Sequence, residues 1–215
     1  PRSTPLYSSA ASDVYKRQVL VIDAIGEWNT MTQWKVKDGN FSLIKEWNYP
    51  KSLGLFYSAM TQAAGWKPNE EEYILMGASA VSRNFNIYDY QYTKSLWNNN
   101  KSFHQGIDLE GLTDEFEIAA IAQDIYEEEF QKIINEIDDE NLVFVGGCAL
   151  NVSANRFLTK FNTFIPCNPG DGGSAIGCAL DHKIEPNPNL GSVSYTHLLA
   201  HETLRYLVCR RLLEK

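Results

Sequence analysis

The chain has 215 residues, of which 44% are hydrophobic, enough for one large domain or for a domain and part of a second. Its formal net charge of −8 disfavours nonspecific nucleic-acid binding, because phosphate contacts need clustered Lys and Arg. The sequence contains neither an apolar run long enough to cross a membrane nor a secretory signal, so we expect a cytoplasmic protein that acts without a membrane. The four cysteines lack CxxC spacing, which argues against a zinc knuckle or a disulfide framework.

The two ends of the chain read differently from the rest. Residues 1–18 and 193–215 resemble translated sequencing-adaptor segments, so we expect them to lie outside the fold, the first of them disordered. The second carries His197 and His201, whose spacing could place two imidazoles on one helix face as metal ligands, but the foreign character of the segment argues against a metal site there. Residues 19–192 remain as a partial domain.

The first half of that domain predicts three strands and two helices. Residues 19–22 form a buried strand that ends at Asp23, and residues 31–36 and 41–47 form two more, joined by the hairpin signal Asp38-Gly39. Residues 51–64 have helical periodicity and are followed by Gly65 as a C-terminal cap. A short second helix is predicted from an Asn69 cap to Gly77. Residues 79–111 lose all periodicity and predict an irregular, aromatic-rich insertion.

The second half alternates strands and helices around two glycine turns. Residues 113–137 carry the longest apolar stripe and predict the longest helix. A strand over 142–145, a turn, a helix over 149–161, a strand over 163–166, a second turn and a helix from Ser174 follow. The element order predicts a mixed α/β fold with a three-stranded N-terminal meander, a mixed sheet and flanking helices.

The two turns are the strongest functional signal. Gly146 and Gly147 form the first, and the second contains Gly170, Gly172 and Gly173. Glycine lets a backbone approach phosphate closely, and a following helix directs its positive end toward an anion, so the turns predict nucleotide binding. The alternative is that these glycines only allow close packing or a tight turn.

Several polar residues accompany the turns. Asp171 in the second turn suggests a bound cation, and Asp23 ends the first strand, although either carboxylate could instead cap a turn. Asn151 and Asn155 lie four residues apart on the predicted 149–161 helix, where they could bind phosphate or ribose or remain solvated. Neither reading is decided by the sequence.

Three local patterns together resemble the actin, heat-shock and sugar-kinase ATPase fold, specifically its second lobe. In that fold the pattern Asp23-x-x-Gly26-x-x-x-Thr30 corresponds to a phosphate loop, which assigns Gly26 and Thr30 to phosphate binding. The hydrophobic-Gly146-Gly147 pattern is similar to its adenosine motif, and the pattern around Asp171 is similar to its closing glycine motif.

At a finer level, residues 19–180 resemble the O-carbamoyltransferases of the NodU and tobramycin type. The matching stretches are VIDAIGEW, YPKSLGLFYSAMTQAAGWKPNEEEYILMG, GGCALNVSAN and NPGDGGSAIGCAL. The resemblance implies transfer of a carbamoyl group from carbamoyl-adenylate to a hydroxyl of a small metabolite or sugar. It also implies a second domain of the same parent chain that makes the adenylate from carbamoyl phosphate and ATP, as well as a hydroxylated acceptor as partner.

The resemblance further implies a divalent metal, Fe²⁺ or Mn²⁺, at the nucleotide phosphates. In the family a pair of upstream histidines and two aspartates hold it, and the aspartates fall on Asp23 and Asp171. The sequence departs from the family at Ala24, where the motif has Gly, and it carries no matching upstream histidine pair, so we expect the isolated chain to be inactive. Catalytic residues are not assigned. The alternatives are a carbohydrate or acyl kinase lobe and a non-catalytic nucleotide-binding lobe.

Overall fold

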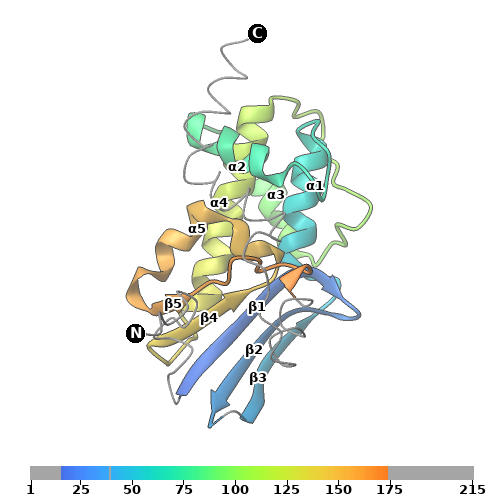
Figure 1. Ribbon diagram of the computed structural model, residues 1–215. Helices are drawn as coiled ribbons and strands as arrows, with labels where there is room; N and C mark the ends of the chain where they lie inside the picture. The colour runs from blue at the N-terminus through green and yellow to red at the C-terminus, as the bar shows by residue number, and fades with distance from the viewer. Residues whose placement is uncertain (1–15, 39, 174–215) are drawn as a thin grey trace.

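A five-stranded mixed sheet forms the base of the domain in the computed structural model, which describes residues 16–38 and 40–173 (Figure 1). Its order is β3-β2-β1-β4-β5; β1 to β3 pair antiparallel, and β4 and β5 continue the sheet parallel to β1. The mixed α/β class and the N-terminal meander are therefore confirmed. The strands are β1 Lys16–Gly26, β2 Asn29–Lys37, β3 Asn40–Asn48, β4 Asn141–Val145 and β5 Asn162–Phe164.

Strand β1 begins earlier than the sequence predicts. Lys16 pairs with Lys37 and Gln18 with Lys35, so residues 16–18 belong to the sheet and not to a disordered leader. Gln18 is buried, and its Oε1 accepts a 2.9 Å hydrogen bond from Gln33 Nε2. The boundary drawn between residues 18 and 19 therefore needs correction.

Helix α1, Leu53–Ala63, follows the edge strand β3 in the chain and packs against β1. Ser52 caps it, because its Oγ accepts a 3.1 Å hydrogen bond from Leu55 N. Gly65 follows the C-cap with φ +87° and its N–H donates to Gln62 O, as predicted for a glycine that ends a helix.

Helix α2, Glu72–Val81, differs at both ends from the prediction. Asn69 does not cap it: Asn69 lies outside the helix with φ +65°, and its own N–H donates to Glu72 Oε1. Gly77 lies buried within the helix instead of ending it, because neighbouring apolar residues on both sides pack into the core.

The predicted irregular insertion was wrong in its middle, where helix α3 spans Ile87–Asn98. Asn86 caps this helix by accepting a hydrogen bond from Tyr88 N at 2.9 Å. Trp97 is its buried anchor and packs edge-on against Phe56 and stacked on Phe103. The polar, tyrosine-rich outer face hid the short buried face from a periodicity argument.

Helix α4, Glu115–Ile134, confirms the predicted longest helix and forms the centre of the core. Asp114 caps it by accepting hydrogen bonds from Phe116 N and Glu117 N, both at 2.9 Å. Its apolar face packs on the sheet, where the Phe130 and Phe144 rings lie 5.4 Å apart.

The single helix predicted over 149–161 is instead three short pieces. A 3-10 helix η1 spans Gly147–Leu150, α5 spans Val152–Asn155 and a second 3-10 helix η2 spans Arg156–Lys160. Hydrogen bonds from side chains, described below, replace regular helical bonds here. Strand β5 is shorter than predicted, and the helix predicted from Ser174 lies outside the described residues.

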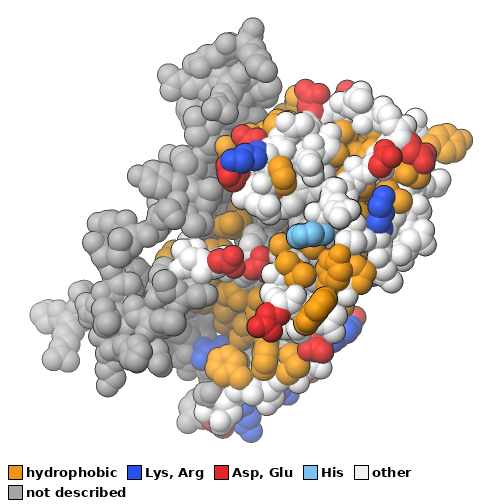
Figure 2. Space-filling view, turned by 90° about the vertical axis from the view of Figure 1, so that its right-hand side faces the viewer, with side chains coloured by type: hydrophobic (Ala, Val, Ile, Leu, Met, Phe, Trp, Pro, Cys, Tyr) orange, Lys and Arg blue, Asp and Glu red, His pale blue; other side chains and the backbone are white. Residues whose placement is uncertain are grey.

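The surface near β3 is apolar for an edge strand. Phe41, Leu43 and Ile44 are 65%, 45% and 48% exposed, and hydrophobic side chains gather in the lower half of Figure 2, which views the side carrying β3.

Within residues 16–38 and 40–173, no helix combines the length and hydrophobicity that a membrane span requires.

Candidate functional site

The candidate site lies where the parallel pairing of β1 and β4 ends. Val21 and Val145 form the last pair, so Asp23 and Gly146 lie just beyond it at the same edge of the sheet. Strand β1 does not end at Asp23 as predicted but continues to Gly26, with an irregularity in its pairing to β2 between Ile22 and Gly26. In α/β sheets, ligands bind beyond the carboxyl ends of parallel strands. The sheet topology thus brings together two residues that are more than one hundred positions apart in the sequence.

Gly146 is the position at this edge that is least able to carry a side chain. Its φ is +97°, and a Cβ built there would lie 2.1 Å from the carbonyl oxygen of Ile22. Its N–H donates a 2.7 Å hydrogen bond to Pro169 O. Only glycine fits between the two strands at this point, and its backbone ties the first glycine turn to the second.

Gly147 and Gly170 complete the contact between the turns. A Cβ on Gly147 would lie 3.2 Å from Asp23 Oδ1, and one on Gly170 would lie 4.0 Å from Gly147 Cα. We call Asp23, Gly146, Gly147 and Gly170 the glycine edge. Asp171 follows directly and is exposed, so both predicted metal ligands lie on or beside this edge.

The start of α1 is pressed against the same edge, a contact that the sequence analysis missed. A Cβ on Gly54 would lie 2.7 Å from Ala24 N and Ala24 Cα. The Ser52 hydroxyl contacts the carbonyl oxygens of both Ala24 and Asp23. The sequence carries a signal for this contact, a capping serine two residues before a glycine at a helix start. Ser52 fixes the backbone that carries Asp23.

The second turn folds around Asn168. This residue is buried, a Cβ on Gly173 would lie 2.2 Å from its carbonyl oxygen, and one on Gly172 would lie 2.6 Å from its Nδ2. The Gly173 N–H donates to Gly170 O at 2.9 Å. Gly172 and Gly173 therefore shape the turn that carries Asp171, while their predicted contact with a nucleotide stays a prediction.

The hydroxyl of Thr30 is engaged by backbone of the fold. Its side chain is buried, and its hydroxyl donates to Lys51 O at 2.6 Å. Thr30 thus joins β2 to the segment that leads into α1. Gly26 is exposed at the end of β1, opposite Asn29. The phosphate-loop role of these two residues stays a prediction, and the structure gives Thr30 a structural one.

Asn151 also faces the interior. Its Oδ1 accepts from Ala154 N at 3.0 Å and from Gln123 Nε2 at 3.1 Å, and its Nδ2 donates to Gln123 Oε1 at 3.1 Å. Asn155 donates from Nδ2 to Ala149 O at 2.8 Å. Both amides hold the chain after the first glycine turn, and direct nucleotide binding by Asn151 stays untested.

A buried thiol and a buried phenol lie beneath the first turn. Burial raises the pKa of Cys148 to about 12, so this thiol is neutral and unreactive at physiological pH. Tyr126 donates from its hydroxyl to Cys148 O at 3.2 Å. Burial raises the pKa of Tyr126 well above its usual value, which keeps it a hydrogen-bond donor. These groups support the turn and do no chemistry.

The donor set at the edge suits a divalent cation with oxygen ligands. Asp23 Oδ1 accepts from Ala24 N at 2.8 Å, which orients the carboxylate, and the missing side chain of Gly147 leaves space beside that oxygen. Among the described residues, no three His, Cys, Asp or Glu side chains gather as a complete metal site would need. Asp23 and Asp171 are thus two carboxylates on or beside the edge, and their role as metal ligands stays a prediction.

The fold and the edge together define an α/β domain with a candidate ligand site where the parallel pairing of two strands ends. Comparison with known families is more specific. Two segments, residues 6–104 and 83–180, match the family described as carbamoyltransferase N-terminus, and the chain belongs to that family. The first matched segment begins inside the stretch that the sequence analysis set apart as foreign.

Two relatives are similar to this chain over much of its length. An uncharacterised protein of Synechocystis is 34% identical over 200 residues, which covers 75% of this chain and 32% of the relative. An uncharacterised protein of Methanocaldococcus jannaschii is 27% identical over 222 residues, which covers 91% of this chain and 42% of the relative. The chain thus spans a third to two fifths of the length of these relatives.

Proposed function

We propose that this chain is the nucleotide-phosphate-binding part of an O-carbamoyltransferase that transfers a carbamoyl group from carbamoyl-adenylate to a hydroxyl of a small metabolite or sugar. The observation that carries the proposal is the convergence of Asp23 with both glycine turns where the pairing of β1 with β4 ends, in a chain of the carbamoyltransferase family.

Each part of the glycine edge has a role in the proposal. The absence of a side chain at Gly147, beside Asp23, lets the phosphate of an adenylate approach the backbone closely, while Gly146 holds the two turns together. Asp23 and Asp171 would hold Mn²⁺ or Fe²⁺, and such a bound cation neutralises the leaving phosphate and polarises the carbonyl. The edge thus binds and orients the donor, while the acceptor needs positioning and a proton acceptor.

The experiment uses a longer protein that carries this chain together with the proposed adenylate-forming domain. Supplied with carbamoyl phosphate, ATP and a panel of hydroxylated acceptors, we expect it to release AMP and to form a carbamoylated product. An Asp23→Asn variant should lose the product, because its amide binds a cation poorly. Release of ADP in place of AMP would instead identify a carbohydrate or acyl kinase, and the absence of both would reject the assignment.

A second candidate is a lobe that binds nucleotide without catalysis. It is favoured by Thr30 and Asn151, whose polar atoms serve the fold, and by the lack of a three-ligand metal cluster among the described residues. Titration of the 215-residue chain with ATP and Mn²⁺ separates these two nucleotide-binding candidates, the transferase and the non-catalytic lobe, from a purely structural lobe. Binding that Asp171→Ala weakens supports a working site; no binding supports the structural lobe.

A further inference from the structure

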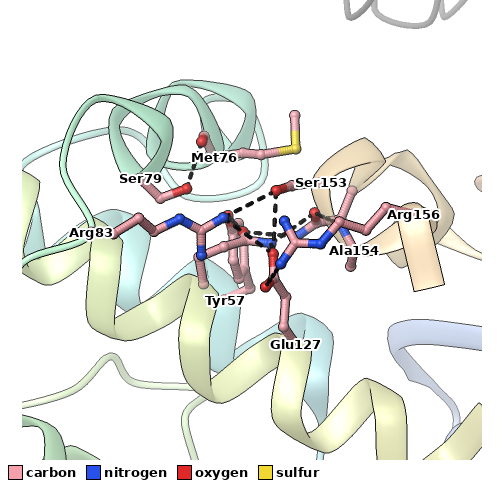
Figure 3. A network of polar contacts seen from close by, with 10 residues as sticks. Tyr57, Met76, Ser79, Arg83, Glu127, Ser153, Ala154 and Arg156 are labelled. Atoms are coloured by element: carbon pink, nitrogen blue, oxygen red, sulfur yellow. Dashed lines mark hydrogen bonds and ion pairs between the residues drawn. The ribbon is translucent and has the colours of Figure 1, made fainter.

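A polar cluster surrounds the buried Glu127 of α4 (Figure 3) and reaches the segment after the first glycine turn through Gln123 and Asn151. Its two arginines, Arg83 and Arg156, are partly exposed. Glu127 is its centre, with a side chain 6% exposed, and the other members come from α1, α4, α5, η2 and the segment after α2. We call these residues the Glu127 cluster: Tyr57, Arg83, Gln123, Glu127, Ser153 and Arg156.

Glu127 is held by four donors. Its Oε1 accepts from Gln123 Nε2 at 2.8 Å, from Ser153 Oγ at 3.2 Å and from Arg83 Nη2 at 3.4 Å. Its Oε2 accepts from Arg156 Nη2 at 2.6 Å. A carboxylate this deeply buried is stable only with such partners, so its position and orientation are fixed.

Glu127 in turn fixes the amide of Gln123. Because Nε2 donates to the carboxylate, Oε1 must face the other way, where it accepts from Tyr57 Oη at 2.7 Å. Burial raises the pKa of Tyr57 well above its usual value, which keeps this phenol a donor. Gln123 therefore presents one donor and one acceptor to Asn151 in a single orientation.

Asn151 ends the segment 146–151 that starts at the glycine edge. Its side chain makes the reciprocal 3.1 Å amide pair with Gln123 and also caps α5 through Ala154 N. At the other end of the segment, Gly146 N donates to Pro169 O. The backbone between these two anchors has no long helix to stiffen it, because η1 is a single 3-10 turn.

We propose that Gln123 is a positioning residue for nucleotide binding: it holds Asn151, and through Asn151 the glycine turn, while Glu127 orients the Gln123 amide. Asn151 acts through this pair and does not touch the nucleotide. The inference rests on the proposed function, because it assumes that the turn binds a nucleotide. If Gln123 served stability alone, its substitution would lower the free energy of unfolding without selectively changing the affinity for ATP.

The test measures the dissociation constant of ATP with Mn²⁺ by calorimetry on the 215-residue chain. We expect Gln123→Leu to raise this constant about tenfold, the loss expected for a displaced contact worth about 1.4 kcal/mol. Gln131→Leu is the matched control, since it makes the same change on α4 outside the cluster, and it should bind as the wild type does. Tyr57→Phe is a smaller change, on the far side of the Gln123 amide, and should give a smaller loss of affinity.

A double-mutant cycle then decides how Asn151 acts. If it acts only through Gln123, the variant with both Gln123→Leu and Asn151→Leu binds no worse than Gln123→Leu alone. Additive losses would mean that Asn151 touches the ligand and would overturn the inference. Amide hydrogen exchange of residues 147–151 should quicken in Gln123→Leu and not in Gln131→Leu, which gives a readout that does not depend on nucleotide.

The remaining outcomes are distinct. If the wild-type chain does not bind ATP with Mn²⁺, the proposed function fails for this chain and the inference falls with it. If the wild type binds and Gln123→Leu binds equally well, only the inference fails. If Gln131→Leu loses as much affinity as Gln123→Leu, the effect belongs to the stability of α4 and the positioning role is likewise rejected.

Discussion

The glycine edge and the Glu127 cluster are neighbours built on opposite principles. The edge consists mainly of backbone, and its geometry depends on side chains that are missing at Gly146 and Gly147. The cluster consists of long polar side chains whose hydrogen bonds converge on one buried carboxylate. Open backbone can accept a ligand, whereas a satisfied side-chain network gives the adjacent backbone a fixed position.

The largest expected effect is at Gly146. We expect Gly146→Ala to cost more than about 3 kcal/mol of unfolding free energy, because the new Cβ would meet the Ile22 carbonyl oxygen at 2.1 Å in a backbone with φ +97°. Gly65→Ala isolates the backbone term, since Gly65 has φ +87° with open space around it, and should cost about 1 kcal/mol. Urea denaturation measures both; equal losses would show that the close approach of β1 is unimportant.

The cluster should respond next. Glu127→Gln removes the charge that four donors share, and we expect it to cost about 2 kcal/mol, the usual worth of hydrogen bonds to a charged group. Glu136→Gln is the control, because Glu136 pairs with Lys45 at an exposed site, and should cost less than about 1 kcal/mol. Similar costs for the two variants, measured by the same denaturation assay, would contradict the central place given to Glu127.

Gly147 separates binding from folding. Gly147→Ala should change the unfolding free energy by less than about 1 kcal/mol, because its Cβ would only touch the Asp23 side chain, at 3.2 Å. The methyl group would nevertheless occupy the space beside Asp23 Oδ1, so we expect the affinity for ATP with Mn²⁺ to fall about tenfold. Gly170→Ala, with an ordinary 4.0 Å contact, should bind nearly as the wild type does. Unchanged binding in Gly147→Ala would place the ligand elsewhere.

The smallest effect concerns acid stability where α3 rests on α4. Burial opposes the ionisation of Glu128, but hydrogen bonds from Lys132, Lys94 and Tyr90 outweigh it and lower its pKa to about 2. Because this folded-state pKa lies below the unfolded value of about 4.3, the stabilisation is complete above that value and is lost as the pH falls toward 2. The Glu128 side chain is 41% exposed, so solvent screens the effect.

Glu128→Gln tests this acid dependence. The drop in thermal midpoint between pH 6 and pH 3 should be smaller in the variant than in the wild type, since one carboxylate that favours the folded state has been removed. Glu70→Gln, at an exposed pair with Lys67 on the chain before α2, serves as the control and should leave the drop unchanged. If the variant shows the same drop as the wild type, Glu128 does not contribute to the acid dependence of stability.

Much of the fold could be predicted because its signals are local. Two strand patterns joined by a turn signal predicted the hairpin of the meander, a long apolar stripe predicted α4, and an apolar run stopped by Gly146 predicted β4. Helix α3 escaped prediction because its buried face is short: only Thr93 and Trp97 are fully buried, beneath a tyrosine-rich surface. The fragmented 149–161 region escaped because side chains of α4, distant in sequence, bind Cys148 O just before it and the Asn151 side chain within it.

The candidate site divides in the same way. The sequence by itself determined which residues are candidates for the site, Asp23, Asp171 and the turn glycines, because carboxylates beside glycine turns are recognisable wherever the chain places them. Only the tertiary structure decided that the two turns meet beside Asp23, that Thr30 and Asn151 face inward, and that Glu127 and Gln123 stand behind the turn. Those outcomes depend on contacts between residues far apart in the chain, which no local pattern encodes.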